Sequence, residues 1–359
     1  MRPTRLAAFV IAAALAAWAA WSILTPRASA APQQETQGPM RPPGAPPEPQ
    51  QPATIPQRQL PESGHTLKAQ TNLVDIFVTA RGKHNDIIDD LTKKDFKIYE
   101  DGQEQKVAYF DLEKNLPLTL GILIDTSGSM QNILDAEQDT ASRFVRDIMR
   151  KGDEAMVIGF DFDINLLADL TEDPSVLIRA IQGTRINAVA AGVGPTPGTL
   201  PVGQNGGTDL YDAVYLACHD ELIGQSGRKA IILLTDAEDT GSKLSLADAI
   251  ESAQKTNTVI HVLRLADEPF YFGMGMGYTG RSVAVRMASE TGGREIEVRS
   301  EKSLDKAFDE ITEELRSQYV LGYYPTNAKH DGTFRQIKIE ADRSDTHLLY
   351  RKGYYAPAE

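Results

Sequence analysis

The segment Asp125–Ser129, which reads Asp-Thr-Ser-Gly-Ser, combines residue types that bind hard cations. Its spacing turns the carboxylate of Asp125 and the hydroxyls of Ser127 and Ser129 toward a common point, because alternate residues of a tight loop share a side. Such oxygens suit Mg²⁺, Mn²⁺ or Ca²⁺ and are poor ligands for zinc or copper. Alone, the segment is equally consistent with a helix start that Ser127 or Ser129 caps.

Two later segments offer the same kind of oxygen. Thr208 follows Gly206 and Gly207 directly before a predicted helix, which it could instead cap. Asp236 ends the apolar run Ile231–Thr235, where it could also be a solvated acid. Because ligands of open α/β sheets bind at the carboxyl ends of the strands, the three segments together predict one shared metal site.

The elements that would position this site alternate between strand and helix from residue 117 onward. The first helix contains Ile133 and ends near Gly152, and the last one carries its apolar residues on one face. The alternation predicts the α/β class, with a doubly wound, mostly parallel, Rossmann-like sheet and helices on both faces. The predicted strands are Leu118–Ile124, Ala155–Phe160, Leu166–Leu170, Ala230–Leu234, Val259–Leu265 and Arg294–Val298. The later helices are Ser175–Gln182, Leu210–Ile223, Leu246–Lys255, Val283–Glu290 and Ser303–Ser317.

The chain on either side of this region favours β structure. Residues 64–113 contain the alternating run Ala69–Ala80 and the dipeptide Asp101-Gly102, a strong signal for a hairpin turn. Residues 319–359 contain three strand-like runs, Tyr319–Tyr324, Phe334–Ile339 and Leu348–Tyr355. Because residues 64–113 are few for an independent sandwich, we expect the two β segments to pair into one β-sandwich around the inserted α/β domain.

The full oxygen set closely resembles the von Willebrand factor A domain and its metal-ion-dependent adhesion site. The resemblance covers roughly residues 117–318, and we place the domain at 114–318. It implies that Ser127, Ser129 and Thr208 ligate Mg²⁺ through their hydroxyls. It also implies that Asp125 and Asp236 act mostly through coordinated waters, with Asp236 ligating directly in some states.

The resemblance further implies a function in protein binding. One coordination position of such a site is left to water, which a carboxylate from a partner can displace. The partner would therefore be a protein that presents Asp or Glu. The stretch Leu91–Gly102 and the loop Asp125–Met130 also resemble a bacterial group of exported proteins with "VWFA-related" domains, which implies architecture more than function.

The N-terminus predicts export. Met1–Arg5 is basic, Leu6–Leu24 is an apolar run, and Ala28-Ser29-Ala30 offers a cleavage pattern. Residues 1–30 are thus either a signal peptide or a retained anchor in the inner membrane, and the Pro/Gln-rich residues 31–63 form a linker. We expect a periplasmic or extracellular protein.

Charge and cysteine content exclude several classes of function. The net charge of −13 argues against binding to nucleic acid or to anionic membranes, so a membrane contact is expected only through the N-terminal anchor. A single cysteine, Cys218, rules out an internal disulfide and a CxxC zinc site.

Two loops are candidates for contact with the partner. Residues 183–207 form a Gly/Pro-rich insert that runs through Gly207 into Thr208. A glycine-rich loop at 270–278 presents Phe270, Tyr271, Met274 and Met276, which suit an adaptable protein contact.

We therefore expect an exported, non-enzymatic, metal-dependent adhesion or scaffolding protein. The alternative is an exported Mg²⁺-dependent phosphohydrolase, which needs a nucleophile or general base and a cation for the phosphate. The run Phe160–Asn165 is similar to a phosphatase D-x-D loop, but Asn165 departs from that pattern and a turn between strands is the simpler interpretation.

Overall fold

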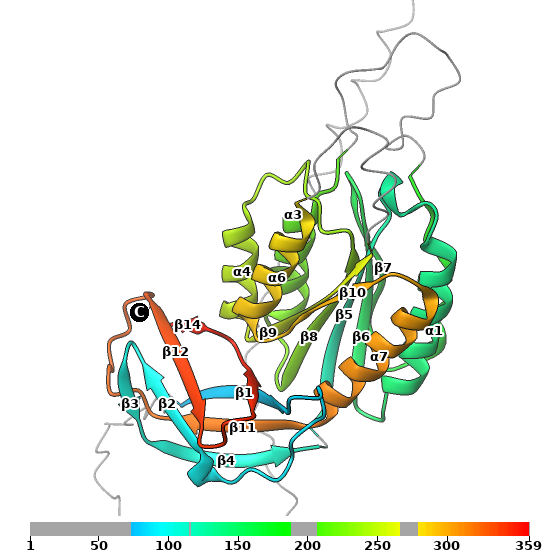
Figure 1. Ribbon diagram of the computed structural model, residues 1–359. Coiled ribbons are helices and arrows are strands. Elements are labelled where there is room, and N and C mark those ends of the chain that lie inside the picture. Colours follow the sequence, from blue (N-terminus) through cyan, green and yellow to red (C-terminus); the bar gives the residue numbers. More distant parts are fainter. Residues whose placement is uncertain (1–72, 115, 188–206, 266–278, 359) are drawn as a thin grey trace, which may run out of the picture. The chain divides into compact units, whose positions relative to one another are not determined.

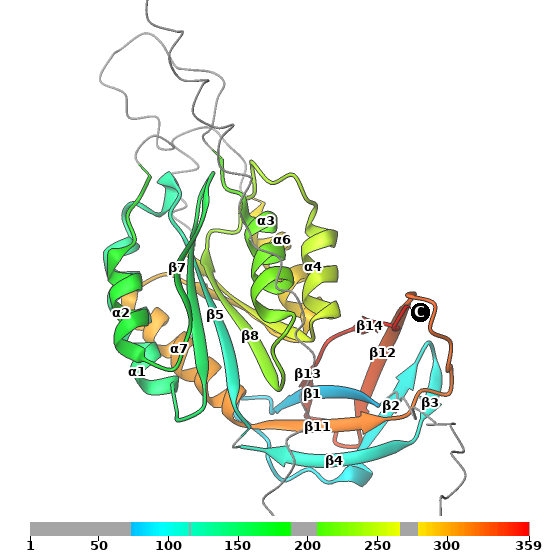
Figure 2. The same cartoon turned by 180° about the vertical axis from the view of Figure 1, so that it is seen from behind.

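The computed structural model describes residues 73–114, 116–187, 207–265 and 279–358 (Figures 1 and 2). The expected signal or anchor (1–30), the linker (31–63), most of the 183–207 insert and the 270–278 loop lie outside these ranges. No helix in the described ranges is long and apolar enough to cross a membrane.

A six-stranded sheet forms the centre of the α/β domain, in the order β10-β9-β8-β5-β6-β7. Its strands pair in parallel except for β7, which runs antiparallel to β6 at one edge. The predicted doubly wound, mostly parallel sheet is therefore confirmed. The strand bounds are β5 Leu118–Asp125, β6 Glu154–Phe160, β7 Ile164–Thr171, β8 Arg228–Thr235, β9 Thr258–Leu265 and β10 Glu295–Val298.

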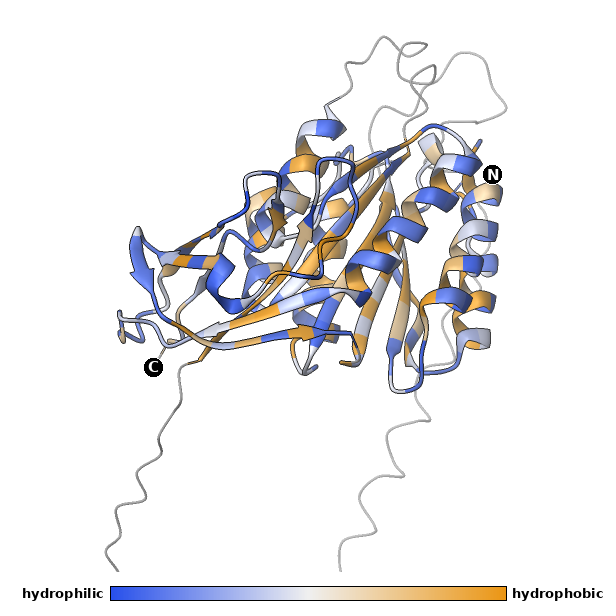
Figure 3. Cartoon of the chain, turned by 60° about the horizontal axis from the view of Figure 1, so that its bottom comes forward, coloured by the Kyte–Doolittle hydropathy of each residue, from blue (hydrophilic) through white to orange (hydrophobic). Residues whose placement is uncertain are grey.

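Helices cover both faces of this sheet. One face packs against α1 (Leu134–Ile148), α2 (Pro174–Gly183) and α7 (Glu301–Arg316). The other packs against α3 (Leu210–Leu216), its π-helical continuation Ala217–Leu222, α4 (Leu246–Lys255) and α6 (Gly280–Thr291). Cys218 lies buried in this second layer. Figure 3 shows the reason for the layering, since the central strands are largely hydrophobic whereas the helices carry hydrophilic outer faces.

The flanking β segments pair into one sandwich, as predicted. One sheet has the order β13-β1-β11-β4 and the other β14-β12-β2-β3, so each sheet mixes strands from both ends of the folded chain. Their facing side chains form a single core that includes Ile76, Ile98, Leu321 and Ile337. The bounds are β1 Val74–Arg81, β2 Phe96–Glu100, β3 Gln103–Gln105, β4 Val107–Glu113, β11 Gln318–Tyr323, β12 Phe334–Ala341, β13 His347–Leu349 and β14 Gly353–Tyr355.

Two short 3-10 turns complete the described elements, at Lys93–Asp95 and Gly128–Met130. The β2–β3 connection is the hairpin that the sequence predicts. Asp101 and Gly102 have φ values of 47° and 82°, so both turn positions are in the left-handed region.

The C-terminal run Leu348–Tyr355 is not one continuous strand. It divides into β13 and β14, which belong to different sheets of the sandwich. Between them Arg351 bridges to Thr291, and the amide of Lys352 donates to the carbonyl of Glu290, so the crossing segment follows the end of α6. At Gly353 a Cβ atom would lie 2.5 Å from the carbonyl oxygen of Arg335, so the backbone of β12 leaves little room for a side chain where β14 begins.

A buried ion-pair network joins the sandwich to the α/β domain. Arg81 of β1 and Arg294, which precedes β10, both donate to Oε1 of Glu314 on α7. Nδ1 of His261 on β9 lies 3.7 Å from the other oxygen of Glu314. Burial, then the charges of Arg294 and Arg81, lowers the pKa of His261 to about 3, so this imidazole is neutral at physiological pH. Glu314 is the fully buried acceptor of the network, and Glu310 on the same helix also pairs with both arginines.

Candidate metal centre

Asp125 is the last residue of β5, the central strand to which β6 and β8 are both paired. Its carboxylate is fully buried and held at both oxygens. Oδ1 accepts from the amide of Ser127 at 2.9 Å, and Oδ2 accepts from the hydroxyl of Thr235 at 2.6 Å. Thr235 ends β8, so the neighbouring parallel strand fixes the orientation of Asp125.

The two serines of the loop meet the aspartate that follows β8. The hydroxyls of Ser127 and Ser129 lie 3.0 Å apart, and the Ser129 hydroxyl donates to Oδ2 of Asp236 at 2.5 Å. Asp236 is buried, which excludes its interpretation as a solvated strand-end acid. Four of the five predicted oxygen donors thus converge at one edge of the sheet.

The interpretation of these serines as helix caps is wrong. Ser127 precedes the 3-10 turn, but its side chain makes no capping hydrogen bond. Ile133 occupies the N-cap position of α1 without a side-chain cap, and the Ser129 hydroxyl donates to Asp236 instead. The loop therefore holds its hydroxyls toward carboxylates and not toward the helix.

Thr208 lies at the same sheet edge but on a separate loop. Its amide donates to the Thr240 hydroxyl at 3.0 Å, and its carbonyl accepts from the amides of Thr240 and Gly241. Three hydrogen bonds therefore join the Thr208 loop to the loop that follows β8. Asp209, and not Thr208, is the N-cap residue of α3. Within the described residues, no hydrogen bond joins Thr208 directly to Ser127 or Ser129.

Asp161, which the sequence interpretation demoted, links the Thr208 loop to the first loop. Its carboxylate accepts from the Thr126 hydroxyl at 2.7 Å, and its carbonyl accepts from the amide of Asp209, also at 2.7 Å. The Asp-Phe-Asp segment is the turn between β6 and β7, as the simpler interpretation held. Its position in the sequence could have indicated this role, because Asp161 directly follows β6, which ends at the same edge of the sheet.

A second residue missed from the sequence is Glu137, on the buried face of α1. Its side chain is fully buried, and neither carboxyl oxygen has a hydrogen-bond partner within the described ranges. Burial, and to a lesser degree the charge of Asp125, holds the pKa of Glu137 well above its ordinary value. Glu137 comes four residues after Ile133, which places it on the same face of the helix. A charged residue on that otherwise apolar face could have indicated a buried carboxyl group.

The carboxyl groups of Asp125 and Asp236 at this edge are shielded from water. Burial, then the charge of Asp236, raises the pKa of Asp125 to about 7, although hydrogen bonds from Ser127 and Thr235 oppose that shift. Buried carboxylates are costly unless they are protonated, paired or bound to a cation.

The donor set fits a hard divalent cation. Among the described residues, no group of three or more His, Cys, Asp or Glu side chains could hold a metal ion. A metal at this edge would therefore depend on hydroxyl as well as carboxylate oxygens, and such oxygens suit Mg²⁺, Mn²⁺ or Ca²⁺.

Of the residues predicted to contact a partner, Gly207 precedes Thr208 at this edge and is partly exposed. A Cβ atom on Gly207 would lie 3.2 Å from Cα of Gly241, so the two loops pack closely here. Phe270, Tyr271, Met274 and Met276 lie outside the described residues.

The α/β part is thus an open-sheet domain with an oxygen-rich site at its strand ends. Residues 120–238 match the family model of the von Willebrand factor type A domain, so the chain contains a domain of this family. The match spans the loop from Asp125, Thr208 and Asp236 alike. No curated protein sequence matches significantly.

Several solved structures are similar to this chain. One is a von Willebrand factor type A protein from Catenulispora acidiphila, with 14% identity over 74% of this chain and 74% of that chain, at a TM-score of 0.45. Another is the conserved hypothetical protein BatB from Bacteroides thetaiotaomicron, with 17% identity over 56% of this chain and 100% of that one, at 0.41. A third is the vWF domain of the type V pili tip protein Mfa5 from Porphyromonas gingivalis, with 15% identity over 56% and 95%, at 0.39.

Proposed function

We propose that this chain is an exported, non-enzymatic protein that binds an acidic protein partner through a divalent metal ion at the β5 edge. The observation that carries the proposal is the convergence of Ser127, Ser129 and Asp236 within a von Willebrand factor type A domain. Three chain segments, the β5 loop, the α3 loop and the end of β8, supply oxygens to that edge.

In this proposal the hydroxyls of Ser127, Ser129 and Thr208 hold the metal. Asp125 and Asp236 act mainly through water molecules, and their negative charge compensates that of the cation. When bound, Mg²⁺ supplies a coordination position that prefers an anionic oxygen. Thr235 and the amide of Ser127 keep Asp125 in place, and Asp161 holds the Thr208 loop against Thr126.

A pull-down from envelope extract of the source organism tests this function. The bait is the full chain in Mg²⁺, compared with the same bait in EDTA and with Asp125→Ala. Asp139→Ala serves as a matched control, because Asp139 is an exposed acid on α1 away from the predicted ligands. We expect one partner that is present with the wild type and Asp139→Ala and lost in EDTA and with Asp125→Ala.

Partners that persist in all four samples would contradict the metal-bridged contact. Metal-dependent hydrolysis of a generic phosphate ester by the wild type, lost in Asp125→Ala, would instead favour the phosphohydrolase alternative. No specific observation within the described residues favours that alternative.

A further inference from the structure

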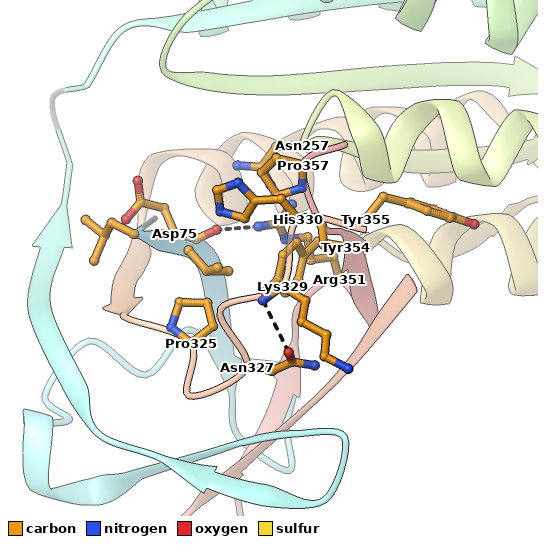
Figure 4. Close-up of a pocket in the computed structure, with 13 residues that line it drawn as sticks. Asp75, Asn257, Pro325, Asn327, Lys329, His330, Arg351, Tyr354, Tyr355 and Pro357 are labelled. Atoms are coloured by element: carbon orange, nitrogen blue, oxygen red, sulfur yellow. Dashed lines mark hydrogen bonds between the residues drawn. The ribbon is translucent and has the colours of Figure 1, made fainter. Parts of the chain in front are cut away.

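A cavity of about 270 Å³ lies where the β-sandwich meets the turn between α4 and β9 (Figure 4). Its walls come from the start of β1, the connection between β11 and β12, and the segment from Arg351 to Pro357. Asn257 of the α4–β9 turn contributes from the α/β domain. None of the proposed metal ligands is among the residues that line it, so its chemistry is separate from that of the metal centre.

Two cations line the cavity without a carboxylate partner. Nη2 of Arg351 donates to the backbone carbonyl of Asp75 at 2.7 Å, and the guanidinium lies 5.6 Å from the ring centre of Tyr354. Figure 4 shows that the Asp75 carboxylate points away from this contact. Within the described ranges no ion pair involves Arg351 or Lys329, whereas Arg335 of the same sandwich pairs with Asp331 at 2.9 Å.

The Arg351 guanidinium is therefore compensated only through space by the Asp75 carboxylate, which does not bond to it. Its Nε is buried and has no hydrogen-bond partner in the described part of the chain. Burial lowers the pKa of Arg351 to about 10, so the group stays cationic at neutral pH. A partly desolvated cation with so distant a counter-charge is unfavourable, and an anion in the cavity would supply a closer one.

The other residues that line the cavity indicate what kind of uncharged group the anion would carry. Tyr354, Pro325 and Pro357 are joined by Leu73 and Val74, so most of the surface is apolar or aromatic. The volume lies below the roughly 300 Å³ at which small-molecule sites usually begin, which limits the ligand to a small group. The negative charge of Asp75 close by disfavours a dianion such as phosphate.

We propose that this cavity binds a carboxylate attached to a small apolar or aromatic body, with Arg351 next to the carboxylate and the exposed Lys329 adding positive charge to the lining. Two sources share this chemistry, a free aromatic or aliphatic acid and the C-terminal residue of a peptide. The inference is independent of the proposed function, because the binding needs no divalent metal.

The test is a titration of the full chain with 4-fluorobenzoate, followed by ¹⁹F NMR without divalent metal. The neutral analogue 4-fluorobenzamide has the same body without the charge. We expect 4-fluorobenzoate to bind with a Kd on the order of 1 mM, as suits so small a ligand, and the amide not to bind. Equal binding of the two compounds, or binding of neither, would overturn the proposal.

Variants locate the site. Arg351→Gln should weaken binding by about tenfold or more, because it removes a hydrogen bond to a charged group. Lys329 is exposed, so Lys329→Gln leaves the fold intact and should weaken binding by about threefold. Lys352→Gln is the matched control, since Lys352 is adjacent in sequence but does not line the cavity, and its affinity should not change. Wild-type affinity in Lys329→Gln and in folded Arg351→Gln would contradict the assignment.

Competition separates the two sources. A tripeptide that ends in phenylalanine with a free carboxylate is added to bound 4-fluorobenzoate, beside the same peptide with an amidated C-terminus. Displacement by the free form alone, at lower concentration than benzoate itself requires, would assign a peptide terminus. Weaker displacement than by benzoate would assign a free acid.

Discussion

Replacing Glu314 by alanine should lower the free energy of unfolding by about 3–5 kcal/mol, the usual cost of breaking a buried ion pair. The carboxylate is fully buried and accepts from Arg81 and Arg294, which in the variant keep only the partly exposed Glu310 as a carboxylate partner. Urea unfolding monitored by circular dichroism measures the effect. Glu313→Ala is the matched control, because Glu313 is the exposed neighbour on the same helix.

The position of Glu314 explains why its loss should destabilise both the sandwich and the α/β domain. Arg81 belongs to the sandwich, and Glu314 belongs to α7 of the inserted domain. A loss confined to α7 would leave the sandwich transition unchanged, whereas we expect one cooperative transition shifted as a whole. If Glu314→Ala unfolds at the same urea concentration as Glu313→Ala, the network does not stabilise the fold.

The second large effect concerns Asp125→Asn and divalent metal. A ligand at one hundred times its Kd stabilises the folded state by about 2.7 kcal/mol. We expect Mg²⁺ to raise the Tm of the wild type accordingly and to leave Asp125→Asn unchanged, because the amide supplies no negative charge. Asp139→Asn should respond like the wild type. Equal Mg²⁺ shifts in Asp125→Asn and the wild type would remove Asp125 from the site.

A comparison of the wild type with Asp125→Asn also tests the raised pKa of Asp125. Its folded value of about 7 exceeds the value of about 3.9 expected in the unfolded chain. The folded state therefore binds the proton more tightly, so this group's contribution to stability is greatest below pH 4 and is lost as the pH rises toward 7. Without metal, the stability of the wild type relative to Asp125→Asn should fall between about pH 4 and pH 7. The opposite trend of His261 is common to both proteins and cancels.

The sequence predicted the sheet edge well because strand ends are a local signal. An apolar run that stops at Asp125, and another that stops before Asp236, needs only parallel pairing to bring the two aspartates together. The sandwich could be predicted for a related reason, since residues 64–113 alone have too little surface to bury.

What failed depended on contacts distant in sequence. Leu348–Tyr355 has the pattern of one strand, and no local feature shows that the chain crosses between sheets at Arg351. Asp161 and Glu137 have ordinary local interpretations, as a turn residue and a helix acid. Only the tertiary structure shows that Asp161 joins two loops and that Glu137 is buried without a partner.

A crystal grown with MnCl₂ tests the metal centre most directly, because Mn²⁺ scatters anomalously and takes the same oxygen ligands as Mg²⁺. We expect one anomalous difference peak per chain, bordered by the hydroxyls of Ser127, Ser129 and Thr208. A crystal without a peak at the carboxyl end of β5, or with its only peak elsewhere, would contradict it.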